Sequence, residues 1–398
     1  MDLDLTPDER RFQTELRDWL RAHVPKRERG ARRGAPREEL GAERVAALKA
    51  WQRELDAAGY VAIGWPREHG GRGASIMEQT ILGEELVRAR APGLIGQMGV
   101  SMVGPTLIQW GTEAQKRAFL PKIRSAEHLW CQGYSEPGAG SDLASLQTRA
   151  ERRGDRFVVT GQKIWTSNAQ IADYMFCLVR TNPSAPKHRG ISYLLIDMRA
   201  PGITLRPLVQ MTGDAGFNEV FFDGVEVPVE NAVGPIDEGW KVANTTLAHE
   251  RNMLGSTTQT QQLFDGLVRL ARRARRGGRP ATEDPLVRQR LAELKIRVES
   301  LRFLAYRNLT AALRGRRGGI EASITKLATT ELNHELARTA IELLGMAGPL
   351  YRGSPRLEDG GLWPYQLMFS LGMIIGGGTS QIQKNIIAQR GLGLPRAG

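Results

Sequence analysis

Hydrophobic residues recur at helical spacing near the start of the chain, where Phe12, Leu16 and Leu20 are separated by four residues each. Residues 6–9 read TPDE and precede this run, which predicts a helix start with a capping box. The helical pattern returns over residues 45–58, 75–90 and 104–123. The N-terminal third is therefore expected to be helical.

From about residue 130 the pattern changes to short apolar runs that are interrupted by Gly and Pro, which is typical of strands. After Gly239 long helical patterns return, and residues 280–284 are expected to connect two helices. The order α, β, α predicts three domains, at residues 1–127, 128–236 and 237–398. The expected strands cover residues 157–160, 174–179, 191–196 and 217–228, and the expected C-terminal helices cover residues 240–276, 285–314, 321–344, 365–375 and 380–390.

Composition narrows the function classes. The 398 residues contain no apolar run of about 18 residues and no signal-type start, so we expect a cytoplasmic protein with no membrane association. Cys131 and Cys177 lack metal-ligand spacing, and the six histidines lie far apart, so no metal site is expected. The net charge of +12 suits an anionic partner, which is either nucleic acid or a small ligand with several phosphates.

Two segments are candidates for ligand binding. Residues 134–142 read YSEPGAGSD, a loop of small residues whose backbone N–H groups and hydroxyls can hold a polar ring edge or a phosphate. Residues 163–168 read KIWTSN and follow at a fixed distance. Together these strings resemble the signatures of the acyl-CoA dehydrogenase family. The resemblance continues at residues 104–107, 111–116 and 378–383, and so covers nearly the entire chain.

The resemblance implies an α+β multidomain fold with an N-terminal helical domain, a middle β-barrel and a C-terminal four-helix bundle. It implies FAD as the cofactor, bound without a Rossmann motif, and a homo-oligomer that is a dimer or a tetramer. The matching positions assign Gln132 and Ser135 to the pyrimidine side of the flavin and Ser141 to the phosphates of FAD or CoA. Trp165 would cover the ring, and Ser167 would bond flavin N5, the hydride acceptor.

Near the C-terminus the resemblance places Thr379, Ser380 and Gln381 at FAD, where a glycine-rich turn enters a helix. Free N–H groups at a helix start attract anions, which gives this placement a physical basis. The spacing of Ser380 and Gln383 also predicts a capping box. Binding and capping are compatible interpretations.

The general base departs from the commonest family pattern, because Gly377 stands where most members carry a glutamate. A subgroup that includes isovaleryl-CoA dehydrogenase has the carboxylate on the first long C-terminal helix, and the matching residue here is Glu250. Ala243, Leu247, Glu250 and Leu254 share one helix face, so Glu250 lies on an apolar stripe. The alternative is a structural pair with a cation from another helix, for which Arg302 and Arg307 are candidates.

The implied reaction is α,β-dehydrogenation of an acyl-CoA or acyl-carrier thioester. Glu250, with a pKa raised by burial, removes the α-proton while the β-hydrogen leaves as hydride. The amide of Gly377 donates to the enolate-like oxygen. Arg251 lies beside CoA, and electrons pass to an electron-transfer flavoprotein. Loss of side chains at Gly376 and Gly377 widens the pocket and predicts a branched, cyclic or otherwise bulky acyl group.

Other interpretations stay open. A flavin oxidase or hydroxylase is possible on the same fold, and so is a DNA-binding relative or one subunit of a mixed tetramer with an incomplete site. The flavin strings and Glu250 favour a small-molecule substrate over nucleic acid. Two departures leave details of FAD binding unassigned: residues 272–280 read RRARRGGRP where the family often has Arg-x-x-Phe-Gly, and Glu342 replaces a frequent Gln.

Overall fold

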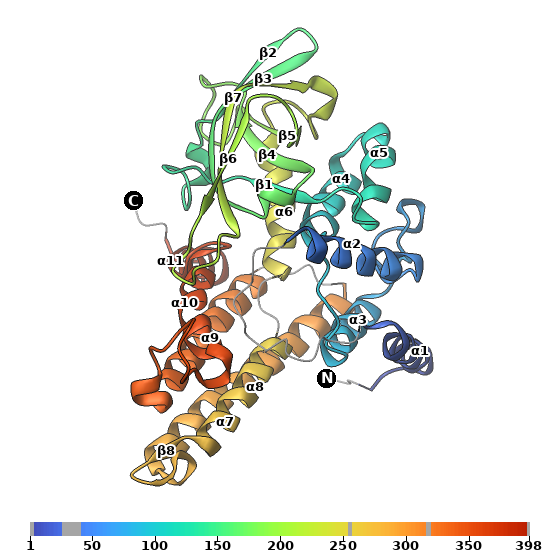
Figure 1. Cartoon of the computed structure of the whole chain (residues 1–398). Helices are drawn as coiled ribbons and strands as arrows, with labels where there is room; N and C mark the ends of the chain where they lie inside the picture. The colour runs from blue at the N-terminus through green and yellow to red at the C-terminus, as the bar shows by residue number, and fades with distance from the viewer. Residues whose placement is uncertain (1–3, 26–40, 254–256, 316–319, 396–398) are drawn as a thin grey trace. The chain divides into compact units, whose positions relative to one another are not determined.

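The computed structural model describes residues 4–25, 41–253, 257–315 and 320–395, with the backbone alone for residues 250–253 (Figure 1). The chain forms two compact units, which are described separately below. One unit contains residues 39–75 and 92–250, and is called the sheet unit. The other contains residues 1–38, 76–91 and 251–398, and is called the helical unit.

The sheet unit is built around a seven-stranded sheet with the pairing order β1-β4-β2-β3-β7-β6, in which β5 pairs with β4. The long strands β3 and β7 are antiparallel neighbours, whereas β1 and β4 run parallel. The strands are β1 (Trp130–Gly133), β2 (Arg149–Arg153), β3 (Arg156–Ser167), β4 (Tyr174–Arg180), β5 (Ile191–Asp197), β6 (Ile203–Leu208) and β7 (Phe217–Pro228).

One face of this sheet forms a core in which Phe157, Val159, Ile196 and Val220 are almost fully buried. The alternation of buried and exposed positions along β3 and β7 follows from the two-residue period of a strand. The sheet unit also contains the helices α2 (Ala42–Ala57), α4 (Gly104–Trp110), α5 (Glu113–Arg124) and α6 (Gly239–Met253), the last of which ends beyond the unit boundary.

The helical unit packs its long helices around a core that includes Leu267, Leu294, Leu336 and Trp363. Thr6 caps α1 together with Glu9, so the predicted capping box is confirmed. The helices are α1 (Pro7–His23), α3 (Ile76–Arg88), α7 (Thr257–Arg273), α8 (Pro285–Leu313), α9 (Glu321–Leu344), α10 (Leu362–Ile375) and α11 (Ser380–Ile386), and a π-helical turn over Ile387–Gly391 follows α11.

The predicted helix over residues 240–276 differs from the structure at its C-terminal end. Helix α7 ends at Arg273, and β8 (Arg275–Arg276) and β9 (Arg279–Pro280) form a hairpin instead. Gly277 and Gly278 both have positive φ angles, +55° and +79°, as a two-residue hairpin turn requires. The simple connection expected at residues 280–284 is therefore the second hairpin strand and a short 3-10 helix, Ala281–Glu283.

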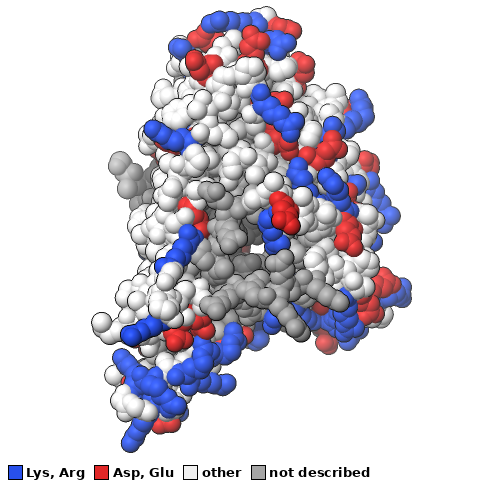
Figure 2. All heavy atoms as spheres, viewed as in Figure 1, with Lys and Arg blue, Asp and Glu red and all other residues white. Residues whose placement is uncertain are grey.

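The hairpin carries a concentration of basic side chains, which Figure 2 shows at the tip of this region. Two arginines of this region are ion-paired: Arg273, at the end of α7, with Asp359 at 2.7 Å, and Arg276 of the hairpin with Asp284 at 3.0 Å. Elsewhere on the visible face, basic and acidic side chains are interspersed. No helix in the described ranges is both long enough and apolar enough to span a bilayer.

Candidate functional site

The loop that follows β1 is a tight turn built from the first motif. The Glu136 N–H donates to the Ala139 carbonyl at 3.2 Å, and the Ala139 N–H donates back at 3.0 Å. Gln132 and Ser135 are half-buried, whereas Ser141 is exposed. Pro137, Gly138 and Gly140 of this turn are exposed, whereas Ala139 is buried.

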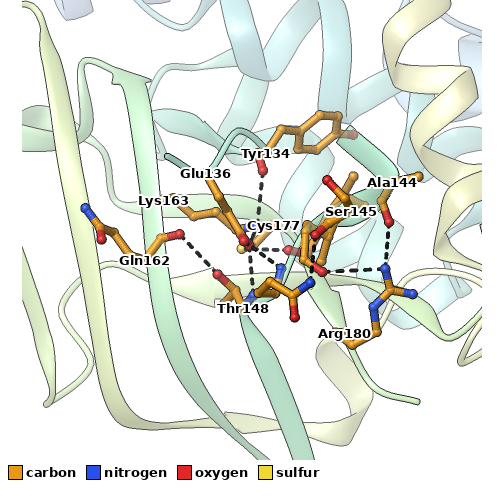
Figure 3. A network of polar contacts seen from close by, with 12 residues as sticks. Tyr134, Glu136, Ala144, Ser145, Thr148, Gln162, Lys163, Cys177 and Arg180 are labelled. Atoms are coloured by element: carbon orange, nitrogen blue, oxygen red, sulfur yellow. Dashed lines mark hydrogen bonds and ion pairs between the residues drawn. The ribbon is translucent and has the colours of Figure 1, made fainter. Parts of the chain in front are cut away.

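A buried ion pair joins this loop to the second motif (Figure 3). The Lys163 ammonium is fully buried and lies 2.8 Å from Glu136 Oε1, and it also donates to the Tyr134 carbonyl at 3.1 Å. The backbone N–H groups of Gln147 and Thr148 donate to the two oxygens of Glu136 at 2.6 and 2.8 Å. Both oxygens of Glu136 and the Tyr134 carbonyl therefore accept hydrogen bonds within one network.

This network sets the charge of Glu136. Burial alone raises the pKa of Glu136, but the Lys163 charge and the donated hydrogen bonds outweigh burial and hold that pKa below its ordinary value. The Ile164 N–H also donates to the Ser135 carbonyl at 2.9 Å. The two motifs, 27 residues apart between Glu136 and Lys163, are thus fixed in one register.

Trp165 occupies a strained and exposed position. A bulge interrupts the β3–β7 pairing between Lys163 and Thr166. Trp165 lies in this bulge with φ +59°, a conformation that is costly for a bulky side chain. Its indole is 57% exposed and meets Phe217 edge to face. An exposed aromatic held by strained backbone indicates a binding surface rather than a core position.

The residues beside Trp165 include unsatisfied buried polar atoms. Thr166 Oγ1 and Asn218 Oδ1 are buried and have no partner among the described residues, although the Asn218 amide donates to the Thr166 carbonyl at 3.2 Å. Ser167 is half-buried and pairs with Phe217 in the sheet register. Buried polar atoms without partners need an explanation, and a bound ligand is one. The family resemblance assigns Ser167 to the flavin and gives no role to Thr166.

In the helical unit, a glycine turn joins α10 to α11. Gly377 and Gly378 have φ angles of +64° and +91°, which favour glycine. The Gln383 side-chain amide donates to the Gly377 carbonyl at 2.8 Å. The Gly377 N–H donates to no acceptor within the described ranges. Among the described residues, this backbone donor is therefore unpaired.

The start of α11 corrects one prediction. Thr379, and not Ser380, is the N-cap, because its hydroxyl accepts from the Ile382 N–H at 3.2 Å. Gln383 turns toward Gly377 and cannot complete a capping box with Ser380. Ser380 Oγ is buried with no partner among the described residues, and Gln381 is exposed. The helix begins at Ser380, one residue earlier than a capping box with Ser380 as its N-cap would imply.

Helix α6 carries the backbone of Glu250 and Arg251, whose side chains lie outside the described residues. The Thr246 hydroxyl, one turn earlier, lies 2.8 Å from the Thr106 hydroxyl of α4, and Ala243 is fully buried. Leu247 is half-buried, and Leu254 lies outside the described residues. The predicted buried face is thus present up to the turn that precedes Glu250.

One candidate partner for Glu250 has a partner of its own. Arg302 lies 2.8 Å from Glu299, one turn away on α8, and its side chain is half-exposed.

The residues predicted to form the site fall into two sets, one in each unit. The sheet unit brings Gln132, Ser135, Ser141, Trp165 and Ser167 onto one β1–β3 framework, and the helical unit brings Gly377, Thr379, Ser380 and Gln381 into one turn.

Comparison with known proteins covers the whole chain. Family models described as acyl-CoA dehydrogenase N-terminal, middle and C-terminal domains match residues 6–127, 131–225 and 237–392. The chain is 39% identical to the acyl-CoA dehydrogenase IpdE1 of Mycobacterium tuberculosis, across 98% of each chain.

Comparison with solved structures identifies the same fold. The Tcur3481-Tcur3483 steroid ACAD superposes with a TM-score of 0.86 at 36% identity, covering all of both chains. The ChsE4-ChsE5 complex from Mycobacterium tuberculosis gives 0.82 at 34% identity, again over the full length of both. The predicted three-part fold, helical, then sheet, then helical, is confirmed. This chain belongs to the acyl-CoA dehydrogenase family of flavoprotein oxidoreductases.

Proposed function

We propose that this enzyme removes hydrogen from the α and β carbons of a bulky acyl-CoA thioester, with FAD as its cofactor and Glu250 as its base. The observation that carries the proposal is the Glu136–Lys163 network, which holds two flavin-type motifs in one register beside the exposed Trp165. Such a framework presents an aromatic face and polar atoms to a planar ligand.

The described residues fit FAD. The hydroxyls of Thr166 and Ser380, which are buried and have no partner among the described residues, offer hydrogen-bonding groups, and Trp165 offers an apolar face. We assign Gln132, Ser135, Ser141, Trp165, Ser167, Thr379, Ser380 and Gln381 to FAD, and Ser141 and Arg251 also to the CoA portion. FAD, when bound, supplies the acceptor for the β-hydrogen, which leaves as a hydride.

The chain's own residues act on the α carbon. Glu250 takes the α-proton as the negative charge develops on the thioester oxygen, in the manner of a positioned general base. The Gly377 N–H donates to that oxygen, and this role needs no side chain at position 377. The α-proton is therefore removed while its charge is stabilised by a fixed backbone donor.

The acyl group is proposed to be branched or polycyclic. Gly376 and Gly377 leave the space at the usual base position empty of side chains, and one protein of similar structure is a steroid ACAD. The proposed acceptor of the electrons is an electron-transfer flavoprotein. Two similar solved structures, Tcur3481-Tcur3483 and the ChsE4-ChsE5 complex, are each named for two components, so a mixed oligomer is a second proposal for the assembly.

Substrate bulk is tested with a panel of CoA esters and an artificial electron acceptor. We expect kcat/KM for branched or ring-bearing esters to exceed that for straight-chain esters of equal carbon number by about tenfold or more, since pocket fit discriminates on this scale. Products are checked by mass for loss of two hydrogens. A clear preference for straight chains contradicts the bulky-substrate proposal.

Trp165 provides a separate test of cofactor binding. Replacing Trp165 with Ala is expected to weaken FAD binding about tenfold, or roughly 1.4 kcal/mol, because an aromatic face is lost. Thermal stability of the cofactor-free protein should hardly change, because the side chain is exposed. Phe303→Ala, at another exposed aromatic, is the control. Equal FAD affinity in both variants contradicts the assignment of Trp165.

A further inference from the structure

Lys326 is a fully buried lysine on α9 that none of the motifs includes. Its ammonium donates to the Gly378 carbonyl at 2.7 Å and to the Ile374 carbonyl at 3.0 Å. These two acceptors stand on either side of residues 375–377. One side chain of α9 therefore bridges the last turn of α10 and the far end of the glycine turn.

The buried charge is costly. Desolvation lowers the pKa of Lys326 to about 8, and Glu331, which acts in the opposite direction, does not restore it. Glu331 is itself 3.7 Å from Lys384 of α11. No carboxylate contacts the Lys326 ammonium in the described parts of the chain. An apolar residue of similar volume would fill this position at less cost, so packing alone does not account for the lysine.

The contacts of the turn show what Lys326 controls. The Gly376 N–H donates to the Gly372 carbonyl at 2.8 Å, and Gln383 holds the Gly377 carbonyl. With Lys326 on the Gly378 carbonyl and Gln383 on the Gly377 carbonyl, both carbonyls of the turn have side-chain partners, whereas the Gly377 N–H has no acceptor among the described residues. Gly377 and Gly378 adopt positive φ angles and, being glycines, have no side chains that could hold the turn in place.

We propose that Lys326 is a positioning residue, which fixes the glycine turn so that the Gly377 N–H points to the oxygen on which negative charge develops. This inference rests on the proposed function, in which the Gly377 N–H donates to the thioester oxygen. Preorganised donors are effective because they need no rearrangement during the reaction. Lys326 acts through the backbone and does not itself contact the substrate in this scheme.

The test compares Lys326→Met with Lys384→Met, an exposed lysine on α11. Methionine keeps the length and apolar stem and removes the charge and both hydrogen bonds. Amide hydrogen exchange of peptides spanning residues 372–382 is measured in the purified full chain, with FAD content as a check. We expect faster exchange in Lys326→Met and parental exchange in Lys384→Met.

Steady-state kinetics supply the second measurement. We expect kcat of Lys326→Met to fall about ten- to a hundredfold with little change in KM, less than the roughly 10²–10³-fold loss for a deleted donor. A loosened turn with parental kcat, or unchanged exchange, overturns the positioning role. If the parent enzyme turns over no thioester, the proposed function fails, whereas an active parent with an equally active variant refutes this inference alone.

Discussion

Replacing Glu250 with Gln is expected to slow the reduction of the bound flavin by a CoA thioester about a thousandfold, within the usual contribution of a general base. Glutamine keeps the size of the side chain but cannot accept the α-proton. FAD content and thioester affinity should remain close to those of the parent. The rate is measured by rapid mixing under anaerobic conditions.

Glu238→Gln is the control for this variant, because Glu238 lies just before the same helix and pairs with Lys241 in an exposed position. Its rate should match that of the parent. If Glu250→Gln reduces flavin at the parental rate, the base is another residue. Glu250 would then serve a structural role, as the partner of a cation from another helix.

Replacing Lys163 with Met is expected to lower the free energy of unfolding of the sheet unit by about 3–5 kcal/mol, because Glu136 is left buried without its cation. FAD binding should weaken in parallel, since both motifs lose their common anchor. Denaturant unfolding and FAD titration measure these effects. Arg206→Met, at an exposed arginine paired with Glu219, should cost less than about 1 kcal/mol, because Glu219 keeps its hydrogen bond from Gln162.

A double variant separates charge from packing. Glu136→Gln combined with Lys163→Met removes both charges, and we expect it to recover part of the stability lost in Lys163→Met. A Lys163→Met protein as stable as Arg206→Met contradicts the network's structural role. Recovery in the double variant indicates that the unpaired carboxylate, and not lost volume, caused the damage.

The same pair predicts a pH dependence. Because the pKa of Glu136 is lower in the folded chain than in the unfolded one, its contribution to stability is complete above the ordinary carboxyl pKa. The contribution is lost as the pH falls through the lowered value. In Glu136→Gln this part of the acid dependence should be absent, which unfolding measured across acidic pH tests.

Local signals predicted much of the fold. The capping box at Thr6 and Glu9 and the helix over Glu321–Leu344 depend on residues close in sequence, and both are as expected. The Gly277–Gly278 turn is also a local signal, but the helical pattern is extended to residue 276 in the sequence prediction. It was therefore missed as a hairpin.

The candidate site was harder to predict, because its decisive contacts are between residues far apart in sequence. Glu136 and Lys163 both lie inside the quoted motifs, but only the pairing of the strands reveals their ion pair. Lys326 follows Ser323 by three residues on the buried face of α9, and this helical spacing would have identified Lys326 as a buried position. The domain boundaries proposed from the sequence stay a prediction.

The most direct test of the proposed reaction is anaerobic mixing of the FAD-bound parent enzyme with a branched or ring-bearing acyl-CoA, followed by flavin absorbance. We predict rapid loss of the oxidised flavin spectrum and formation of the α,β-unsaturated thioester. Flavin that stays oxidised with every CoA and acyl-carrier thioester tested, together with salt-sensitive binding to duplex DNA, would contradict it.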